Sequence, residues 1–360
     1  MLLIQSTGAL ASAVFHINNR KSDFTSTDPT FGAVIKAINA AADQIESTVN
    51  TGILSDTNRS NFLSTVASAN ASSQSGLGVD YGSNPALTVV GIGLTGDFNA
   101  GSGGFKTSTG TASNSVPAIG VGLQSSAMVG INAARIGLHK MGPIDPSRLM
   151  LYVNTFGYSL SADALKVNLF NFGVHGQYKL IPKKSLGFIA GWGGIDVGTG
   201  FEYSSLNASY GAKLAVQQVL PVPSTTDTVT VKYTTDYNLG VKTTDFTIPF
   251  EISTNVNFLY LFSLYFGSGI DLNFGKSSTT GGGSGPVTTT YSGNSPAGSN
   301  LFSATGDLNL DTDPYGTPPA LLARVFTGVQ LNIWAFKILS QFTYMSDHTY
   351  AGTLGLRFAL

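Results

Sequence analysis

The sequence predicts an all-β fold: a closed antiparallel transmembrane β-barrel of 12–14 strands with an N-terminal helical segment. Three observations predict it. Segments with large apolar residues at every second position recur along the chain. The residues between them are mostly small or polar, and charged residues make up only 11% of the chain, against roughly 25% in a typical soluble domain. Because a soluble sandwich would carry Lys and Glu on its outer face, this pattern indicates strands whose apolar face meets lipid.

Residues 257–275 show the alternation most clearly. The even-numbered positions of this segment are apolar except for Ser268, whereas the odd-numbered positions include Gly267, Gly269 and Asp271. A period of two residues is typical of a strand, and a membrane-spanning helix would need ~20 residues that are apolar on all faces. We therefore expect the even-numbered side chains to face lipid, and the later odd-numbered ones to face the lumen.

Similar segments follow one another along most of the chain. Thirteen of them are predicted strands: 86–98, 116–125, 127–140, 148–160, 164–180, 185–197, 200–217, 227–236, 239–255, 258–274, 319–333, 335–346 and 349–360. Because single-chain bacterial barrels have even strand counts, either 116–140 is one strand, which gives twelve, or residues 301–310 form another, which gives fourteen. The Gly-, Ser- and Thr-rich residues 275–318 are expected to form the longest external loop.

Residues 1–75 differ from the barrel, which is predicted over residues 76–360. The apolar start MLLIQSTGALASAVF resembles the end of a signal peptide. A helical stripe with spacings of 4, 3, 4, 3 and 4 follows, at Phe31, Ile35, Ile38, Ala42, Ile45 and Val49. A second, weaker helix is expected after Ser55. The two helices are expected to fill the barrel as a plug or to pack beneath it in the periplasm. An ordinary helical hairpin docked on the first strands is the third interpretation.

Composition and motifs argue against several kinds of chemistry. The chain has no cysteine and a net charge of −1, so disulfides, zinc-thiolate sites and a nucleic-acid partner are not expected. Gly91, Gly93 and Gly96 match Gly-x-Gly-x-x-Gly, but no dinucleotide-binding helix follows them. No Gly-x-Ser-x-Gly motif supports a hydrolase. We expect neither an enzyme nor a cofactor, beyond lipid or detergent in the lumen and calcium in a loop.

The calcium hypothesis rests on "DLNLDTDPYG". Asp307, Asn309, Asp311 and Asp313 alternate in this stretch, a spacing that resembles the oxygen ligands of a calcium loop. The Gly and the terminal Glu of an EF-hand are missing, so a solvated acidic turn is the alternative.

Four cationic residues are expected on or near the lumen face: Arg135, Arg324, Lys337 and Arg357. Inward acidic residues other than Asp271 are not evident from the pattern. The lumen is therefore expected to be mostly neutral, and these cations to form structural hydrogen bonds.

The stretch "GLGVDYGSNPALTVVGIGL" (residues 76–94) is similar to a segment of the long-chain fatty-acid transporter family of outer-membrane proteins. In that family a helical hatch passes through an Asn-Pro-Ala motif into the first barrel strand; the matching residues here are Asn84, Pro85 and Ala86. The resemblance implies a fourteen-stranded barrel, plugged by an N-terminal hatch, that passes hydrophobic molecules. The chain departs from it in its longer helical region, its shorter length and its end at Leu360 rather than an aromatic residue. Residues 167–194 also resemble uncharacterised bacterial outer-membrane barrel proteins.

The leading functional hypothesis is a barrel in the outer membrane of a Gram-negative-type bacterium that passes or binds small hydrophobic molecules, with the N-terminal helices as plug. The expected binding residues are Phe31, Ile35, Ile38, Ile45, Val49, Asn84, Pro85, Ala86, Arg324 and Arg357. Expected contacts are membrane lipid, a hydrophobic small molecule, and a periplasmic or outer-membrane protein. The alternatives are a non-transporting barrel that is structural or anchors a partner, and a surface adhesin that acts through residues 275–318.

Overall fold

The structure is a computed structural model. It describes residues 14–18, 36, 39–40, 43–44, 47, 56–82, 88–101, 119–138, 142, 144–185, 187, 189–222, 226–292, 300–309 and 315–360.

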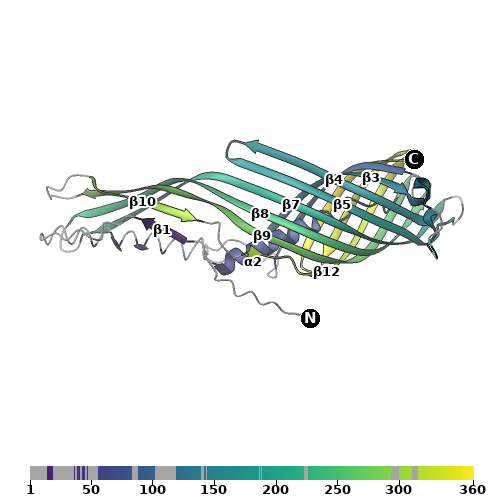
Figure 1. Ribbon diagram of the computed structural model, residues 1–360, viewed down its shortest axis with the longest axis horizontal. Helices are drawn as coiled ribbons and strands as arrows, with labels where there is room; N and C mark the ends of the chain where they lie inside the picture. Colours follow the sequence, from purple (N-terminus) through teal and green to yellow (C-terminus); the bar gives the residue numbers. More distant parts are fainter. Residues whose placement is uncertain are drawn as a thin grey trace.

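Ten strands in the described part of the chain form a closed antiparallel ring (Figure 1). In order around the ring they are β2 (Thr88–Asn99), β3 (Gly120–Asn132), β4 (Leu149–Ala162), β5 (Leu165–Ile181), β7 (Ala190–Pro221), β8 (Thr228–Phe258), β9 (Phe262–Ser292), β12 (Leu321–Ile333), β13 (Phe336–Met345) and β14 (Thr349–Ala359). The ring closes where β14 pairs with β2, with Leu354 opposite Leu94. Closure leaves no backbone edge in the membrane, and the predicted fold class is confirmed.

The sheet as a whole contains fourteen strands, because four more are added outside the ring. They are β1 (Val14–Asn18), β6 (Lys184–Ser185), β10 (Asn300–Asn309) and β11 (Tyr315–Gly316). Strand β10 pairs with β9, and β1 pairs with β10. The helical elements with described bounds are α2 (Asp56–Ser72) and the short 3₁₀ helices η2 (Ala133–Ile136) and η3 (Pro146–Arg148).

The ring has fewer strands than expected because four predicted strands are parts of two longer ones. Residues 185–197 and 200–217 lie largely in β7, and residues 227–236 and 239–255 lie in β8. Backbone pairing continues through the polar positions that suggested breaks: Asn238 lies opposite a glycine of each neighbouring strand. Local sequence does not reveal whether a neighbouring strand is present to form hydrogen bonds with the backbone at such positions.

The two alternatives for the strand count both prove partly right. A single strand, β3, lies within residues 116–140, as one alternative required. Residues 301–310 also contain strand structure, in β10, but this strand lies outside the ring.

The expected loop at residues 275–318 is wrong for most of its length. Residues 275–292 continue β9 and pair with β8, and residues 300–309 form β10. A strand that is polar on both faces has no apolar alternation, so its sequence resembles that of a loop.

Strands β7, β8 and β9 continue far beyond the ring and form one long sheet (Figure 1). We call it the extension: residues 211–221 of β7, 228–238 of β8 and 282–292 of β9, with β10 and β1. Strands β7, β8 and β9 have 32, 31 and 31 residues, whereas ~9–11 residues suffice to cross a membrane. Most of their length therefore lies outside the bilayer.

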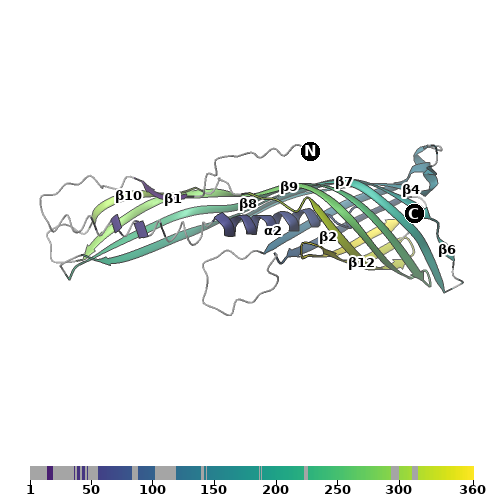
Figure 2. The ribbon, with the colours of Figure 1, turned by 90° about the horizontal axis from the view of Figure 1, so that it is seen from below.

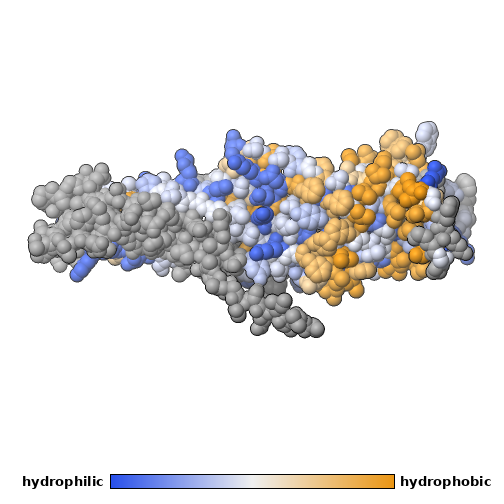
Figure 3. Space-filling view, in the orientation of Figure 1, coloured by the Kyte–Doolittle hydropathy of each residue, from blue (hydrophilic) through white to orange (hydrophobic). Residues whose placement is uncertain are grey.

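Large apolar side chains form a belt on the outer surface of the ring (Figure 3). Members on well-separated strands are Ile92, Leu94, Leu123, Val129, Val153, Phe170, Val174, Phe250, Ile252, Phe266, Ile270, Phe274, Val325, Val329, Ile338, Phe342, Leu354 and Leu356, all at least 40% exposed. Asp271 is only 4% exposed, so the predicted assignment of lipid and lumen faces in this strand is confirmed. The extension is more hydrophilic in the same view (Figure 3). A closed ring with such a belt is an outer-membrane β-barrel.

Among the described residues, no helix is both long enough and apolar enough to cross a membrane.

The lumen is occupied by residues 56–82, which we call the lumenal segment. It comprises α2, the helix expected after Ser55, and the residues that follow it. Residues 65–82 are buried, and α2 packs against β2, β3, β7, β8, β9 and β14, which lie around the ring. Figure 2 shows α2 at the junction between the extension and the ring. Because Gly82 lies beside Gln330 near the opposite end, the segment runs through the lumen from one mouth to the other.

Small residues make room for the helix inside a ten-stranded ring. The buried part of α2 includes Ala67, Ala69 and Ala71. Glycines face it: a Cβ at Gly120 of β3 would collide with the backbone of Thr65, and a Cβ at Gly316 of β11 would collide with the backbone of Leu63. A barrel of this size leaves space for about one helix only when both surfaces are small.

Several predicted residues lie outside the described part of the chain. These are the helical stripe Phe31, Ile35, Ile38, Ile45 and Val49, the motif Asn84, Pro85 and Ala86, and the signal-like residues 1–13. Their proposed roles stay predictions.

Candidate functional site

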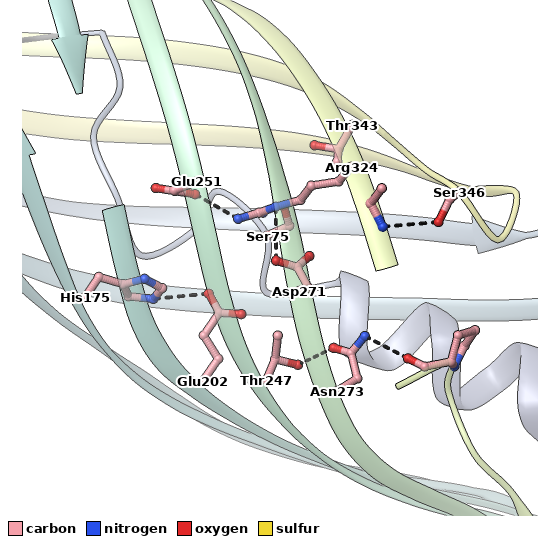
Figure 4. A network of polar contacts seen from close by, with 12 residues as sticks. Ser75, His175, Glu202, Thr247, Glu251, Asp271, Asn273, Arg324, Thr343 and Ser346 are labelled. Atoms are coloured by element: carbon pink, nitrogen blue, oxygen red, sulfur yellow. Dashed lines mark hydrogen bonds and ion pairs between the residues drawn. The ribbon is translucent and has the colours of Figure 1, made fainter. Parts of the chain in front are cut away.

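Arg324 of β12 joins three parts of the molecule inside the lumen (Figure 4). Its side chain is 3% exposed, and its Nη2 lies 2.8 Å from Oε2 of Glu251 on β8. Its Nε lies 3.3 Å from Oδ1 of Asp271 on β9. Its Nη1 donates a hydrogen bond to Oγ of Ser75 in the lumenal segment. The arginine therefore connects the segment to two carboxylates of the wall.

Tyr81 adds a second contact between the lumenal segment and Glu251. Its hydroxyl donates to Oε2 of Glu251 at 2.7 Å, and its carbonyl accepts from Nδ2 of Asn255 at 2.7 Å. Its ring packs against Phe326 and Tyr265, with centroids 4.6 and 5.8 Å away. Glu251 thus receives bonds from both Arg324 and Tyr81, and its charge is neutralised where water is excluded.

Arg357 of β14, two strands along the ring from β12, holds the same segment. Its Nη1 lies 3.1 Å from Oδ1 of Asp80, and both side chains are at most 5% exposed. Its Nη2 donates to the carbonyl oxygens of Val79 at 2.6 Å and Gly76 at 3.3 Å. The φ angle of Gly76 is +83°, a conformation that favours glycine and turns the chain after α2.

The end of α2 is tied to the wall by uncharged donors. Oγ of Ser72 donates to Oδ2 of Asp97 on β2 at 2.8 Å. Nδ2 of Asn70 donates to Oγ of Ser204 on β7 at 2.7 Å and to Asp245 of β8. Polar contacts to β2, β7, β8, β12 and β14 therefore hold the lumenal segment around most of the ring.

The lumen is charged rather than mostly neutral, so the expectation of few inward acidic residues is wrong. Buried carboxylates are Asp80, Asp97, Asp196, Glu202, Asp245, Glu251 and Asp271. His175 lies 3.1 Å from Glu202, and Lys179 lies 2.9 Å from Asp196. The alternation in β7 and β8 is weak, so the sequence did not reveal which of their residues face inward.

The four cationic residues that were predicted on or near the lumen face do not all lie there. Arg324 and Arg357 face the lumen, as expected, and both contact the lumenal segment. Arg135 is exposed on η2, so its predicted lumen position is wrong, because the chain leaves β3 three residues earlier. Lys337 lies near one mouth and donates to the carbonyl of Trp334 at 2.9 Å.

Sequence reasoning missed the residues of the lumenal segment that make the contacts. Ser75, Asp80 and Tyr81 lie in a Gly-rich stretch without apolar alternation or helix signals. The sequence did contain one signal for these contacts. An acidic residue stands beside a tyrosine, with glycines on both sides and a strand after them.

The expected calcium loop is not a loop where it is described. Asp307 and Asn309 belong to β10, which pairs with β9 on one side and β1 on the other. Asp311 and Asp313 lie outside the described residues. In the part of the chain that the structure describes, no three His, Asp or Glu side chains are grouped so that they could hold a metal ion.

The sequence profile of the Lsa36-like proteins matches residues 19–360. The chain belongs to the Lsa36-like family. No curated protein matches the chain significantly.

Solved structures with similar architecture include several outer-membrane barrels. The translocator domain of the autotransporter NalP from Neisseria meningitidis is 10% identical, with 77% of this chain and 90% of that chain covered and a TM-score of 0.26. Omp33 of Acinetobacter baumannii is 8% identical (77% and 100% covered, TM-score 0.26), and the toluene transporter TbuX of Ralstonia pickettii is 8% identical (76% and 90% covered, TM-score 0.24).

The specific resemblance to the long-chain fatty-acid transporter family stays a prediction. The fourteen-stranded barrel that it implied is not found, since the ring in the described residues has ten strands.

Proposed function

We propose that the protein is a sealed outer-membrane barrel, with residues 56–82 as its plug, which anchors the extension on one side of the membrane for contact with a protein partner. One observation supports it most: the lumenal segment is bonded to the wall through buried charged and polar groups on opposite sides of the ring. Arg324 and Arg357 are central to this bonding.

A plug held in this way resists leaving the lumen. Its departure would separate Arg357 from Asp80 and Arg324 from Ser75. The hydrogen bonds from Arg357 to the carbonyls of Val79 and Gly76 would be lost in the same step, so several buried contacts must break together. A permanent seal therefore fits these contacts better than a gate that opens with each transported molecule.

The extension supports the anchoring role. The strands that form it, β7, β8 and β9, are each about three times longer than a bilayer requires. The exposed side chains of the extension include Lys213, Gln217 and Lys232. A long hydrophilic sheet fixed to a barrel presents a surface for a partner on the side that the extension occupies. Because long segments of bacterial barrels lie outside the cell, we place the extension on the external side.

The second candidate is passage or binding of small hydrophobic molecules. It is favoured by a cavity of ≈ 730 Å³ at the mouth opposite the extension, where Leu259, Leu261 and Trp334 provide apolar surface. In this case the lumenal segment would move aside during transport.

Planar-bilayer recordings separate the two candidates. We expect the full chain to show no stable conductance, because the lumenal segment fills the ring. The double variant Arg324→Ala/Arg357→Ala should show frequent openings, because both arginine contacts to the segment are lost. The control variant Lys213→Ala/Lys232→Ala, on the extension, should stay closed. Stable conductance of the unmodified chain, or flux of an apolar dye into proteoliposomes, would contradict the sealed barrel.

The side of the extension can be measured by cysteine labelling, since the chain has no cysteine of its own. Thr226 is exposed and lies between β7 and β8 at the tip of the extension, so Thr226→Cys should react with a membrane-impermeant maleimide on intact cells. Tyr260→Cys, in the turn between β8 and β9 at the other end, should react only after the outer membrane is permeabilised. The opposite labelling pattern would place the extension in the periplasm and end the proposal of an external partner.

A further inference from the structure

A cavity of ≈ 730 Å³ lies at the mouth of the barrel opposite the extension. It is lined by the start of β7, residues 183–185 and 189 before that strand, the turn between β8 and β9, and the turn between β12 and β13. The residues that line it include three lysines, Lys183, Lys184 and Lys337, and no carboxylate.

None of the three lysines forms an ion pair with a carboxylate of the described chain. Lys183 and Lys184 are exposed, and no described carboxylate forms an ion pair with either of them. Lys337 donates to the carbonyl of Trp334 and likewise has no described ion pair. Three ammonium groups on the lining of one cavity, with no carboxylate among the lining residues, make the cavity positively charged and favour an anion in it.

The rim of the cavity is apolar and strained. Tyr260 and Trp334 are 77% and 96% exposed, and Leu259 is 58% exposed. All three have positive φ angles, of +57°, +54° and +49°, a backbone conformation that is unfavourable for a residue with a side chain. Glycine or asparagine would relieve this strain, so the large side chains have a use at these positions.

The rim is continuous with the surface that faces lipid. Phe262 and Phe336 begin the strands that follow the two turns, and they are 50% and 54% exposed on the outer wall. Aromatic residues at a barrel's end lie at the level of lipid headgroups. The lysines of the cavity therefore lie within reach of headgroup phosphates.

We propose that this mouth binds the headgroup of an anionic phospholipid from the adjacent leaflet. The phosphate lies between Lys183, Lys184 and Lys337, and the acyl chains pass over Leu259 and Trp334 onto the outer wall. Ammonium groups bind phosphate through charge-assisted hydrogen bonds, and basic pockets next to a bilayer bind anionic headgroups. The site does not depend on whether the lumen conducts. The proposal of a lipid site is therefore tested independently of the proposal that the barrel is sealed.

Tryptophan fluorescence reports on this cavity directly. The chain has two tryptophans, Trp192 and Trp334, and both line it. We expect the full chain in a neutral detergent to show a saturable fluorescence change with dioctanoyl phosphatidylglycerol. Dioctanoyl phosphatidylcholine, which has the same acyl chains without net charge, and inorganic phosphate should each produce little change.

Matched variants test the role of the lysines. In Lys183→Gln/Lys184→Gln/Lys337→Gln the affinity for the anionic lipid should fall about a hundredfold, since each lysine near an anionic lipid surface contributes ≈ 1 kcal/mol. The control Lys213→Gln/Lys232→Gln/Lys242→Gln removes the same charge from β7 and β8 far from the cavity and should bind as the unmodified chain does. An equal response to the zwitterionic lipid, an equal response to inorganic phosphate, unchanged affinity of the first variant, or no response to the anionic lipid would each overturn the proposal.

Discussion

Replacing Arg324 with alanine is expected to lower the free energy of unfolding by about 3–5 kcal/mol, because it leaves buried charges without a partner. Glu251 and Asp271, whose side chains are 5% and 6% exposed, both face the guanidinium, and Ser75 loses its donor. Equilibrium unfolding of the full chain in detergent, followed by circular dichroism, measures the change. The variant should also lose its lumenal segment more readily than the unmodified protein.

Two comparisons make this result specific. Arg135→Ala removes the same charge from the exposed helix η2 and should change the free energy of unfolding by less than about 0.5 kcal/mol. The double variant Arg324→Ala/Glu251→Ala should be less destabilising than the sum of its two single changes. The first change leaves the Glu251 carboxylate without a partner, and the second removes that carboxylate. A loss below about 1 kcal/mol for Arg324→Ala would mean that the pairs contribute little beyond ordinary surface ion pairs.

Replacing Gly120 with valine is expected to displace α2 from the lumen while the ring stays closed. A Cβ at this position of β3 would overlap the backbone of Thr65 and approach the amide nitrogen of Val66, neither of which can move without moving the helix. Overpacking of this kind typically destabilises by about 1–3 kcal/mol, and more when backbone is involved. Because the three atoms nearest to the added Cβ all belong to α2, the destabilisation should concentrate on the lumenal segment.

Cysteine accessibility measures the displacement. Ala67 is 0% exposed, so a cysteine introduced there should react slowly with a maleimide. Adding Gly120→Val should raise its reaction rate at least about tenfold, which corresponds to about 1.4 kcal/mol on the opening equilibrium. Gly96→Val is the control: Gly96 lies on the outer face of β2, and a Cβ there meets no atom within 4 Å. Equal labelling in both variants would show that α2 is not held against β3.

The route of the lumenal segment has a consequence for assembly. The segment enters at the extension end and reaches Gly82 at the other mouth, and the ring around it is closed by pairing of the last strand, β14, with β2. Its contacts with β8, β12 and β14 join residues more than 160 positions apart in sequence. These contacts form only when the later strands are in place, so the segment and the ring are expected to become ordered together.

The sequence predicted the two-faced character of the strands reliably. In β9, Phe266 and Ile270 face outward and Asp271 inward, as their alternation indicated. The inward positions of Arg324 and Arg357 were predicted on the same basis. Alternation is a local property that follows from the pleat of a strand, so it can be read without knowledge of the neighbouring strands.

The ring size, the extension and the charged lumen were not predicted. Each depends on which backbone lies next to which. Residues 275–292 resemble a loop until β8 lies beside them, and Asp80 has no visible role until Arg357 approaches it from a strand almost three hundred residues away. Residues 76–82 were expected to belong to the barrel region. They lie inside the barrel and are not part of its wall.

The sequence alone therefore determined that the chain forms a β-barrel in a membrane, which strand faces meet lipid, and that a helix follows Ser55. The tertiary structure decided that ten strands close the ring, that β7, β8 and β9 continue beyond it, and that the lumenal segment is fastened by Arg324 and Arg357. The physical reason is the range of the interactions. Alternating burial is set by successive residues along one strand, whereas pairing register and buried ion pairs join groups that only the folded chain brings together.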